Sequence, residues 1–388
     1  MNTSNLLRSM VRSSTLFRNH RHLPRYMKPL NFCKMSVSSN ASQLITQKTK
    51  ESFEDALPSI MDTITTNTQF ADVPEVGNWV KKTLDYNLGG GKKTRGMTTL
   101  LAYEMFEKPG NVTDETIHSA KMLGWCVEML QAYLLILDDI MDSSSTRRGM
   151  PCWYRLPDVG TRAINDAILI YSSMFHVIKT QFGGEKFYTK ILELFNETLF
   201  QTSIGQHLDL TMANRHKNDF SLFTIEQYNA IVKYKTAYYT FKLPVCLGLL
   251  LANNTDPAKH KKVEDICLDI GRFFQIQDDY IDCYGDESVS GKKGTDIQEG
   301  KCSWFAVQAL QRCDANQRTV FCACYGSHEP AHIERIRILY RQLQLPELYA
   351  ETEAKMYDSL ISQARAMPED LSPTLFVKLI DMLNKRSY

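Results

Sequence analysis

The sequence lacks several features that would place it among secreted, membrane-spanning or zinc-binding proteins. Its longest strongly apolar run, residues 243–252, is too short to cross a bilayer. Its 10 cysteines, from Cys33 to Cys324, include no CxxC pair, and no apolar core of a secretory signal precedes them. We therefore expect reduced cysteines packed in the interior, with no disulfide framework, no zinc site and no integral membrane domain.

Acidic residues are absent from the first 50 positions, which contain five arginines and four lysines. A stretch rich in arginine, serine and leucine without acidic residues is typical of a transit peptide. We expect residues 1–41 to be a disordered leader that directs import into mitochondria. An untargeted tail is the open alternative, and a start at Met35 would give a cytosolic form.

The remaining chain carries 36 basic and 44 acidic residues, a balance that argues against a general nucleic-acid surface. It also lacks a linker rich in proline, glycine and serine. From about residue 42 onward, apolar residues recur at helical spacing, with few alternating stretches and no Asn-Gly or Asp-Gly hairpin signal. This pattern predicts one all-α domain over residues 42–388, a bundle of roughly ten or more helices around a central cavity.

Three aspartates and two arginines mark the end of one apolar helical run. Asp138, Asp139 and Asp142 lie at helical spacing, so their carboxylates can project from adjacent turns toward one point. Oxygen ligands of this kind suit a hard divalent cation such as magnesium, which keeps coordination positions for phosphate. Arg147 and Arg148 follow at once and form a fork suited to the same phosphates.

A second acidic motif repeats this spacing. Asp278, Asp279 and Asp282 again stand where an apolar helical run turns acidic. A single triplet is most simply a solvated surface, but two triplets on two helices predict carboxylates that face each other across a cavity. Together they could hold a metal-bridged diphosphate from both sides.

A basic, glycine-rich stretch, GGGKKTRG, occupies residues 89–96. Its glycines let backbone N–H groups approach an anion, and Lys92 and Arg95 add positive charge on the first turn of the next helix. A nucleotide P-loop is excluded, because no glycine stands five positions before the Gly-Lys pair. Gln131 lies two helical turns before Asp138 and can reach into the same cavity.

Two further lysines are expected at the cavity. Lys235 lies in the run KYKTAYY, in a helix that points toward the apolar core, and a lysine there needs an anionic partner. Lys292 belongs to the loop GKKGTDIQEGKCSW, which could fold over the phosphates as a lid. The run GQHLDL places an amide and a carboxylate on one helical face, without an assigned role.

Taken together, these motifs resemble farnesyl diphosphate synthases and their trans-isoprenyl diphosphate synthase relatives, from about residue 42 to the end. The motifs occur in family order: GGKxxRG, DDIMDSSxTRRG, CWY, GQxLDL, KYKTAxY, FQIQDDYxD and GKxGTDIQxxKCSW. The resemblance implies the isoprenoid synthase fold and a prenyltransferase that joins isopentenyl diphosphate to an allylic diphosphate, with release of diphosphate. It also implies a homodimer that needs magnesium or manganese.

The resemblance implies a role for each matching residue. The metal ions on the allylic diphosphate would be held by Asp138, Asp142 and Asp278, with support from Asp139, Asp279 and Asp282. The same diphosphate would be contacted by Arg147, Lys235 and Lys292. Isopentenyl diphosphate would be bound by Lys92, Arg95, Gln131 and Arg148. The allylic cation would be stabilised by the dipoles of Thr236 and Gln275.

Product length is expected to depend on two residues that precede Asp138, Tyr133 and Leu134. Position 134 is leucine where farnesyl-type enzymes usually carry phenylalanine. On an ideal helix Leu134 points within about 40° of Asp138, whereas Tyr133 lies about 140° away on the flank. We expect Leu134 to be the nearer wall of the product cavity and Tyr133 a bulkier one at its side. This predicts chiefly the C15 farnesyl diphosphate, with C10 geranyl diphosphate as a co-product and little C20.

Two other functions fit parts of the pattern. A terpene synthase of the same fold would ionise a prenyl diphosphate without isopentenyl diphosphate, and would need the acidic motifs but not the basic residues of the second substrate. A non-catalytic regulatory subunit would be free to lose an aspartate triad, whereas both are present.

Two further positions depart from the family pattern. The chain ends in KRSY, where the family usually has an uninterrupted basic run, and Gly89 stands where the family usually has a proline.

Overall fold

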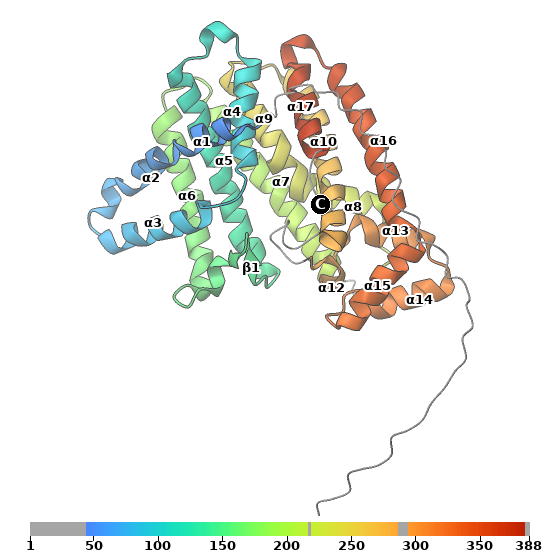
Figure 1. The fold of residues 1–388 in the computed structure, drawn as a ribbon. Coiled ribbons are helices and arrows are strands. Elements are labelled where there is room, and N and C mark those ends of the chain that lie inside the picture. Colours follow the sequence, from blue (N-terminus) through green and yellow to red (C-terminus); the bar gives the residue numbers. More distant parts are fainter. Residues whose placement is uncertain (1–43, 216–218, 286–293, 385–388) are drawn as a thin grey trace, which may run out of the picture. The chain divides into compact units, whose positions relative to one another are not determined.

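Helices make up most of the chain in the computed structural model, which describes residues 44–215, 219–285 and 294–384. The expected all-α fold is confirmed (Figure 1). The α-helices are α1 (Gln47–Glu54), α2 (Leu57–Thr65), α3 (Pro74–Leu88), α4 (Thr94–Phe106), α5 (Asp114–Met141), α6 (Ala163–Phe182), α7 (Tyr188–Arg215), α8 (Ile225–Ile231), α9 (Leu243–Leu251), α10 (Pro257–Tyr284), α12 (Asp296–Glu299), α13 (Trp304–Arg312), α14 (Ala315–Cys324), α15 (Pro330–Gln342), α16 (Leu345–Arg365) and α17 (Pro373–Asn384).

Short elements connect these helices. The 3-10 helices are η1 (Thr68–Phe70), η2 (Pro109–Asn111), η3 (Trp153–Arg155), η4 (Gly160–Arg162) and η6 (Glu369–Leu371). Strands β1 (Thr146–Arg147) and β2 (Met150–Pro151) form an antiparallel pair. The sequence does not predict this hairpin, because its turn residues are Arg148 and Gly149 rather than Asn-Gly or Asp-Gly. Both have positive φ, 56° and 75°, as a type I′ turn requires.

Helix α5 is the central helix of the N-terminal half. Thr113 begins it with a capping box to Thr116, as the polar residues at that point predict. Its length and apolar composition would allow it to cross a membrane, but 72% of its most apolar window is buried among the other helices. Such burial is typical of the core helix of a folded domain. At its far end Asp142 is the C-cap residue, which leaves the acidic motif at the helix terminus.

Close glycine contacts join α4 to α5. A Cβ at Gly96 would lie 2.8 Å from the carbonyl oxygen of Gly124, and one at Gly124 would lie 2.5 Å from the oxygen of Gly96. Glu128 Oε1 accepts the backbone N–H of Gly96 at 2.8 Å beside this crossing. Because α4 begins at the glycine-rich loop, the crossing at Gly124 places the first turn of α4 about two helical turns before Gln131 on α5.

The segment that contains Lys235 is not an ordinary α-helix. Residues Val232–Lys242 form a π-helix, η5, which continues α8 and leads directly into α9. Glycines let it lie very close to the helices on either side. A Cβ at Gly205 of α7 would lie 2.0 Å from the backbone nitrogen of Lys235, and one at Gly271 of α10 would lie 2.3 Å from Ala237 Cβ. π-Helical turns are rare and often occur at functional sites, and this one faces the acidic motifs.

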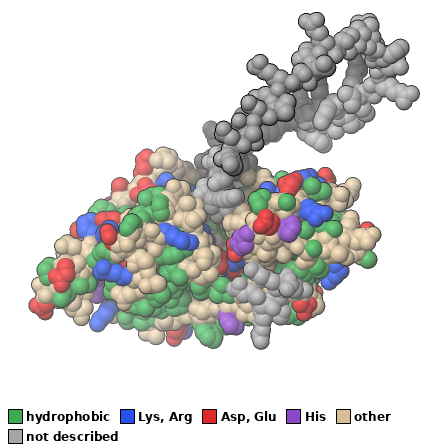
Figure 2. All heavy atoms as spheres, turned by 90° about the horizontal axis from the view of Figure 1, so that it is seen from below, with side chains coloured by type: hydrophobic (Ala, Val, Ile, Leu, Met, Phe, Trp, Pro, Cys, Tyr) green, Lys and Arg blue, Asp and Glu red, His purple; other side chains and the backbone are tan. Residues whose placement is uncertain are grey.

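Three clusters of buried apolar side chains fill the bundle. All cysteines in the described part of the chain are free, and most are buried as expected, although Cys322 is exposed. Figure 2 shows acidic and basic side chains mixed over the visible described surface, without a continuous basic area.

Candidate active site

The first acidic motif lies at the C-terminal end of α5, where Asp138 faces α7 and η5. Its Oδ1 accepts hydrogen bonds from Gln206 Nε2 at 3.0 Å and from Lys235 Nζ at 3.3 Å. Burial would raise its pKa, but Lys235 and then Arg147 outweigh burial and hold the pKa of Asp138 below its ordinary value. The carboxylate therefore stays ionised inside the bundle.

Arg147 joins the first two aspartates of this motif. Its Nε and Nη2 donate to Asp139 Oδ1 at 3.0 and 2.5 Å, and Nη2 lies 3.5 Å from Asp138 Oδ2. The β1–β2 hairpin places the guanidinium there, because Arg147 pairs with Met150 and the chain reverses immediately afterwards. Asp139 is only 3% exposed, so its main effect is to fix Arg147.

Asp209 of α7 joins two lysines beside the same motif. Its Oδ2 accepts hydrogen bonds from Lys235 Nζ at 2.6 Å and from Lys301 Nζ at 2.7 Å. Lys301 Nζ also lies 3.1 Å from both carboxylate oxygens of Asp142. Burial alone would raise the pKa of Asp209, but the two lysines hold it well below its usual range. Burial and then the charge of Asp138 raise the pKa of Asp142.

Sequence patterns alone assign no role to Gln206, Asp209 and Lys301. All three belong to motifs that carry the family resemblance, GQHLDL and GKKGTDIQEGKCSW, and this was the available signal. Their contacts are long-range, since Lys301 lies 159 positions after Asp142. The structure thus brings three residues without a predicted role into the centre of the site.

The second acidic motif, at the end of α10, has a different environment. Asp279 is 3% exposed. Its Oδ1 accepts from Gln275 Nε2 at 2.9 Å, and its Oδ2 accepts the backbone N–H of Trp304 at 2.7 Å. Burial raises the pKa of Asp279 to about 7 despite these hydrogen bonds. The middle aspartate of this motif is therefore a buried structural acid.

The other two acids of this motif lie nearer the surface. Asp282 accepts the backbone N–H groups of Thr295 and Asp296 at 3.0 and 2.9 Å, so it holds the chain that leads into α12. Asp278 is half-buried on α10. Lys292, the basic residue of the expected lid, lies outside the described residues.

Thr236 and Gln275 lie together, as their expected shared role requires. Thr236 Oγ1 of η5 donates to Gln275 Oε1 of α10 at 2.9 Å. Since Gln275 also donates to Asp279, a chain of hydrogen bonds runs from η5 to the second acidic motif. Both dipoles are fixed by this chain.

Arg148 lies against the glycine-rich loop. Gly91 has φ of 74°, and a Cβ there would lie 2.9 Å from Arg148 Cζ, so the loop needs glycine at this position. Arg148 Nη1 donates to the carbonyl oxygens of Asn87 and Gly89 at 3.5 and 3.1 Å. Buried Lys93, whose Nζ donates to the carbonyl oxygen of Gly90, closes the loop from inside.

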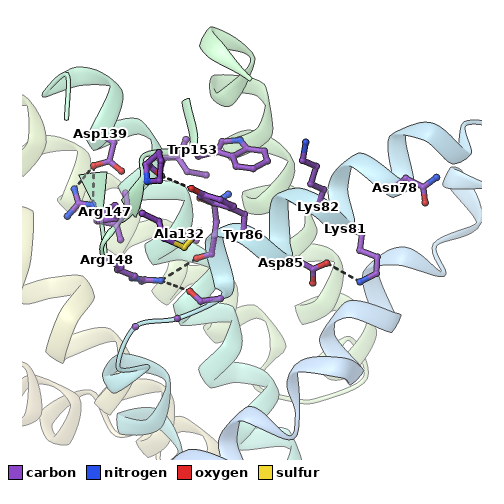
Figure 3. Close-up of a pocket in the computed structure, with 18 residues that line it drawn as sticks. Asn78, Lys81, Lys82, Asp85, Tyr86, Ala132, Asp139, Arg147, Arg148 and Trp153 are labelled. Carbon is purple, nitrogen blue, oxygen red and sulfur yellow. Dashed lines mark hydrogen bonds and ion pairs between the residues drawn. The ribbon is translucent and has the colours of Figure 1, made fainter. Parts of the chain in front are cut away.

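A cavity of about 660 Å³ lies between this loop, α3, α5 and the β1–β2 hairpin. Figure 3 shows Arg147 and Arg148 at one end of the cavity and Lys81 and Lys82 at the other, with Trp153 along one side. An opening with cations at both ends suits an anionic molecule.

The remaining residues expected to bind isopentenyl diphosphate have different surroundings. Arg95 donates to the Tyr239 hydroxyl and to Thr240 Oγ1, both at 2.9 Å. Lys92 is exposed. Gln131 is 7% exposed, and its Oε1 has no hydrogen-bond partner within the described ranges. A buried amide oxygen of this kind is expected where a ligand or a water molecule binds.

A second cavity, of about 350 Å³, runs between α5 and α7. Asp138, Gln206 and Lys235 are among its polar lining residues. Tyr133 and Leu134 line it about one turn earlier on α5, where the lining is apolar. Both residues expected to control product length therefore face the same cavity as Asp138.

Within the part of the chain that the structure describes, no three carboxylate, imidazole or thiol groups converge as a metal cluster. The acids of the first motif instead contact Lys235, Lys301 and Arg147. The carboxylates thus already face a concentrated positive charge.

Comparison with known proteins places this geometry among related enzymes. The family profile described as polyprenyl synthetase matches residues 77–343. A farnesyl pyrophosphate synthase of Murgantia histrionica is 40% identical over 344 residues, which cover 89% of this chain and 84% of that protein. A farnesyl pyrophosphate synthase of Bos taurus is 41% identical over 316 residues, 81% of this chain and 90% of the relative.

Solved structures give the same result for the fold. The farnesyl diphosphate synthase of T. brucei complexed with risedronate superposes with a TM-score of 0.80 and is 33% identical. The superposition covers 88% of this chain and all of that one, 100%. A second T. brucei structure, complexed with a bisphosphonate, gives a TM-score of 0.81 at 31% identity, with 87% and 100% covered.

Proposed function

Because this chain belongs to the polyprenyl synthetase family and is a short-chain trans-isoprenyl diphosphate synthase, we propose that it makes chiefly farnesyl diphosphate. Its substrates are isopentenyl diphosphate and the allylic dimethylallyl and geranyl diphosphates. The fold is the all-α isoprenoid synthase fold. The observation that supports the proposal most strongly is the first acidic motif, whose carboxylates contact a network of lysine and arginine side chains. A second motif of the same spacing lies at the end of α10.

The donor set fits magnesium or manganese. Asp138, Asp142 and Asp278 would hold the metal, because they offer only oxygen ligands, which hard divalent cations prefer. Asp138 and Asp142 already accept the amino groups of Lys235 and Lys301, so both point toward a region that stabilises cations. A bound divalent cation would neutralise charge on the diphosphate and make it a better leaving group.

The protein's own residues support departure of the allylic diphosphate. Arg147 and Lys235 lie beside Asp138 and supply donors for the charge that develops as the C–O bond breaks. Lys292 supplies a third donor for this charge. The leaving diphosphate takes the bonding electron pair, and the fixed dipoles of Thr236 and Gln275 stabilise the allylic cation that remains.

Isopentenyl diphosphate binds on the side of the glycine-rich loop. Lys92 and Arg95 come from the glycine-rich stretch, which contacts Arg148 of the hairpin at Gly91. Gln131 comes from α5, which crosses α4 at Gly96 and Gly124. Its double bond attacks the allylic cation, a new C–C bond forms, and the departed diphosphate accepts the proton that is lost. These four residues favour coupling over a terpene synthase, which needs no second substrate site.

The active unit is a homodimer. Three large apolar side chains are strongly exposed on two helices: Ile164 (46%) and Ile168 (51%) on α6, and Phe200 (69%) on α7. Apolar side chains in such number on adjacent helices favour burial against a second copy of the chain.

Residues 1–41 act as a mitochondrial leader. Their arginine-rich composition without acidic residues supports this proposal.

One incubation tests the proposal. Purified protein with labelled isopentenyl diphosphate, dimethylallyl diphosphate and magnesium should give mainly farnesyl diphosphate, with some geranyl diphosphate. The same protein with farnesyl diphosphate alone should give no hydrocarbon or alcohol above the level of an Asp138→Ala control. Efficient conversion of farnesyl diphosphate alone, without coupling, would show instead that the protein is a terpene synthase.

A further inference from the structure

The apolar part of the cavity between α5 and α7 begins at Tyr133. Of the residues of α5 that line this cavity, Tyr133 comes first in the sequence and Asp138 lies five positions later. At 1.5 Å per residue, the two are about 7.5 Å apart along the helix axis. A chain that grows away from the diphosphate at Asp138 toward the start of α5 therefore meets the Tyr133 ring.

The Tyr133 ring is held in place by a neighbouring helix. Its centroid lies 5.0 Å from that of Tyr171 of α6, and the two ring planes are inclined at 33°. Tyr171 is not among the described residues that line the cavity, so it lies behind Tyr133 as seen from the substrate. Its contact with the Tyr133 ring gives it an effect on the shape of the cavity.

Tyr171 is itself fixed by two further contacts. The Phe175 ring meets it edge-on, with centroids 4.9 Å apart and planes at 83°. Its hydroxyl donates to Asn196 Oδ1 of α7 at 3.4 Å, and Asn196 Nδ2 in turn donates to the carbonyl oxygen of Leu192 at 3.0 Å. Tyr171 thus connects α5, α6 and α7 at the level of the cavity wall.

We infer that Tyr171 is a positioning residue for product length, because it holds the Tyr133 ring against the growing chain. This inference rests on the proposed coupling activity. Removal of the Tyr171 ring opens a space behind Tyr133, and a tyrosine that has lost its aromatic neighbour can turn into that space. The cavity then deepens, so that a C15 product can accept a further five-carbon unit before release.

Three single variants test this inference, with the ratio of C20 to C15 product as the readout. Tyr171→Ala should raise the ratio by roughly five- to tenfold, the range that loss of one aromatic pair allows. Tyr171→Phe keeps the ring and should leave the ratio within about twofold of the original. Tyr188→Ala removes a similarly half-buried tyrosine at the start of α7 and should not change the ratio. A thermal melt of each variant separates loss of stability from change of product.

The double variant shows whether Tyr171 acts through Tyr133. If it does, Tyr133→Ala/Tyr171→Ala should give the same product ratio as Tyr133→Ala alone, because no ring remains to be held. An unchanged ratio for Tyr171→Ala, or a full additional effect of Tyr171→Ala in the Tyr133→Ala protein, would overturn the inference. If the unmodified protein formed no coupled product at all, the proposed function would fail, and this inference with it.

Discussion

The two acidic motifs have the same spacing in the sequence but different surroundings in the structure. In the first, Asp138, Asp139 and Asp142 contact Lys235, Arg147 and Lys301 respectively. In the second, Asp279 is buried and accepts hydrogen bonds from uncharged donors, the Gln275 amide and the Trp304 N–H. The negative charge of the first motif is thus balanced by positive side chains. In the second motif, the raised pKa of Asp279 means that a bound proton balances part of the charge.

Both motifs nevertheless contain one structural acid and other acids that are available to a ligand. In both motifs the middle aspartate is 3% exposed and is committed to a fixed partner. Asp139 fixes Arg147, and Asp279 fixes Gln275. The first acid of each motif, Asp138 or Asp278, is only half-buried and remains the better candidate for a metal ligand.

The largest effect is expected at these first acids. Asp138→Ala and Asp278→Ala should each lower turnover by about a thousandfold or more, because each removes a metal ligand without removing core volume. Incorporation of labelled isopentenyl diphosphate measures turnover, and circular dichroism checks the fold. Asp265→Ala is a suitable control, since Asp265 lies on α10 with 60% of its side chain exposed. Near-normal turnover in both site variants would remove the basis for two cooperating motifs.

The middle aspartates should respond differently to the same substitution. Asp139→Asn should lower turnover roughly 10- to 100-fold, because it weakens the ion pair that aligns Arg147. Asp279→Asn should lower it by less than about fivefold, because asparagine resembles the protonated acid that burial favours there. Equal losses in the two variants would contradict the assignment of different environments, and a kinetic comparison at saturating metal measures them.

The pH dependence of stability should report the buried environment of Asp279. The pKa of Asp279 is about 7 in the folded protein, above its value in an unfolded chain, so the folded state binds the extra proton. The stability linked to that proton is present at low pH and is lost as the pH rises through about 7. Between about pH 5 and pH 8, the unfolding free energy of the original protein should therefore fall relative to Asp279→Asn by about 2–3 kcal/mol. Urea titrations of both proteins test this, and parallel pH profiles would contradict it.

The smallest effect on catalysis is expected far from both motifs. Removal of residues 1–41 should leave turnover within about twofold, since we propose that this segment serves targeting rather than the site. Fused to a reporter, the same residues should direct it to mitochondria. A reporter that stays wholly cytosolic would refute the leader, and a large loss of turnover would show that these residues also serve the catalytic domain.

The sequence predicts features that depend on local pattern. The start of α5 follows from the cap at Thr113, and the acids at its end follow from helical spacing. The family resemblance implies that Thr236 and Gln275 both stabilise the allylic cation, and the structure joins the two side chains by a 2.9 Å hydrogen bond. The expected lid with Lys292 and the basic C-terminus fall outside the described residues and stay predictions.

The sequence does not predict features that depend on distant contacts or unusual backbone. Lys301 reaches Asp142 and Asp209 across the fold, and no local pattern reports such a pairing. The π-helix η5 depends on the close approach of Gly205 from α7 and of α10 on the other side. The usual turn signals do not predict the hairpin at Arg148, because arginine adopts positive φ there in place of asparagine, aspartate or glycine.

Both acidic motifs are expected to act on one diphosphate. Isothermal titration of inorganic pyrophosphate into the protein, with and without magnesium, measures this directly for the original protein, Asp138→Ala, Asp278→Ala and the double variant. We expect magnesium to strengthen binding in the original protein, each single variant to lose most of that increase, and the double variant to lose little more. Magnesium-dependent binding that persists unchanged in Asp278→Ala would show that the second motif does not share the diphosphate, and would contradict the account.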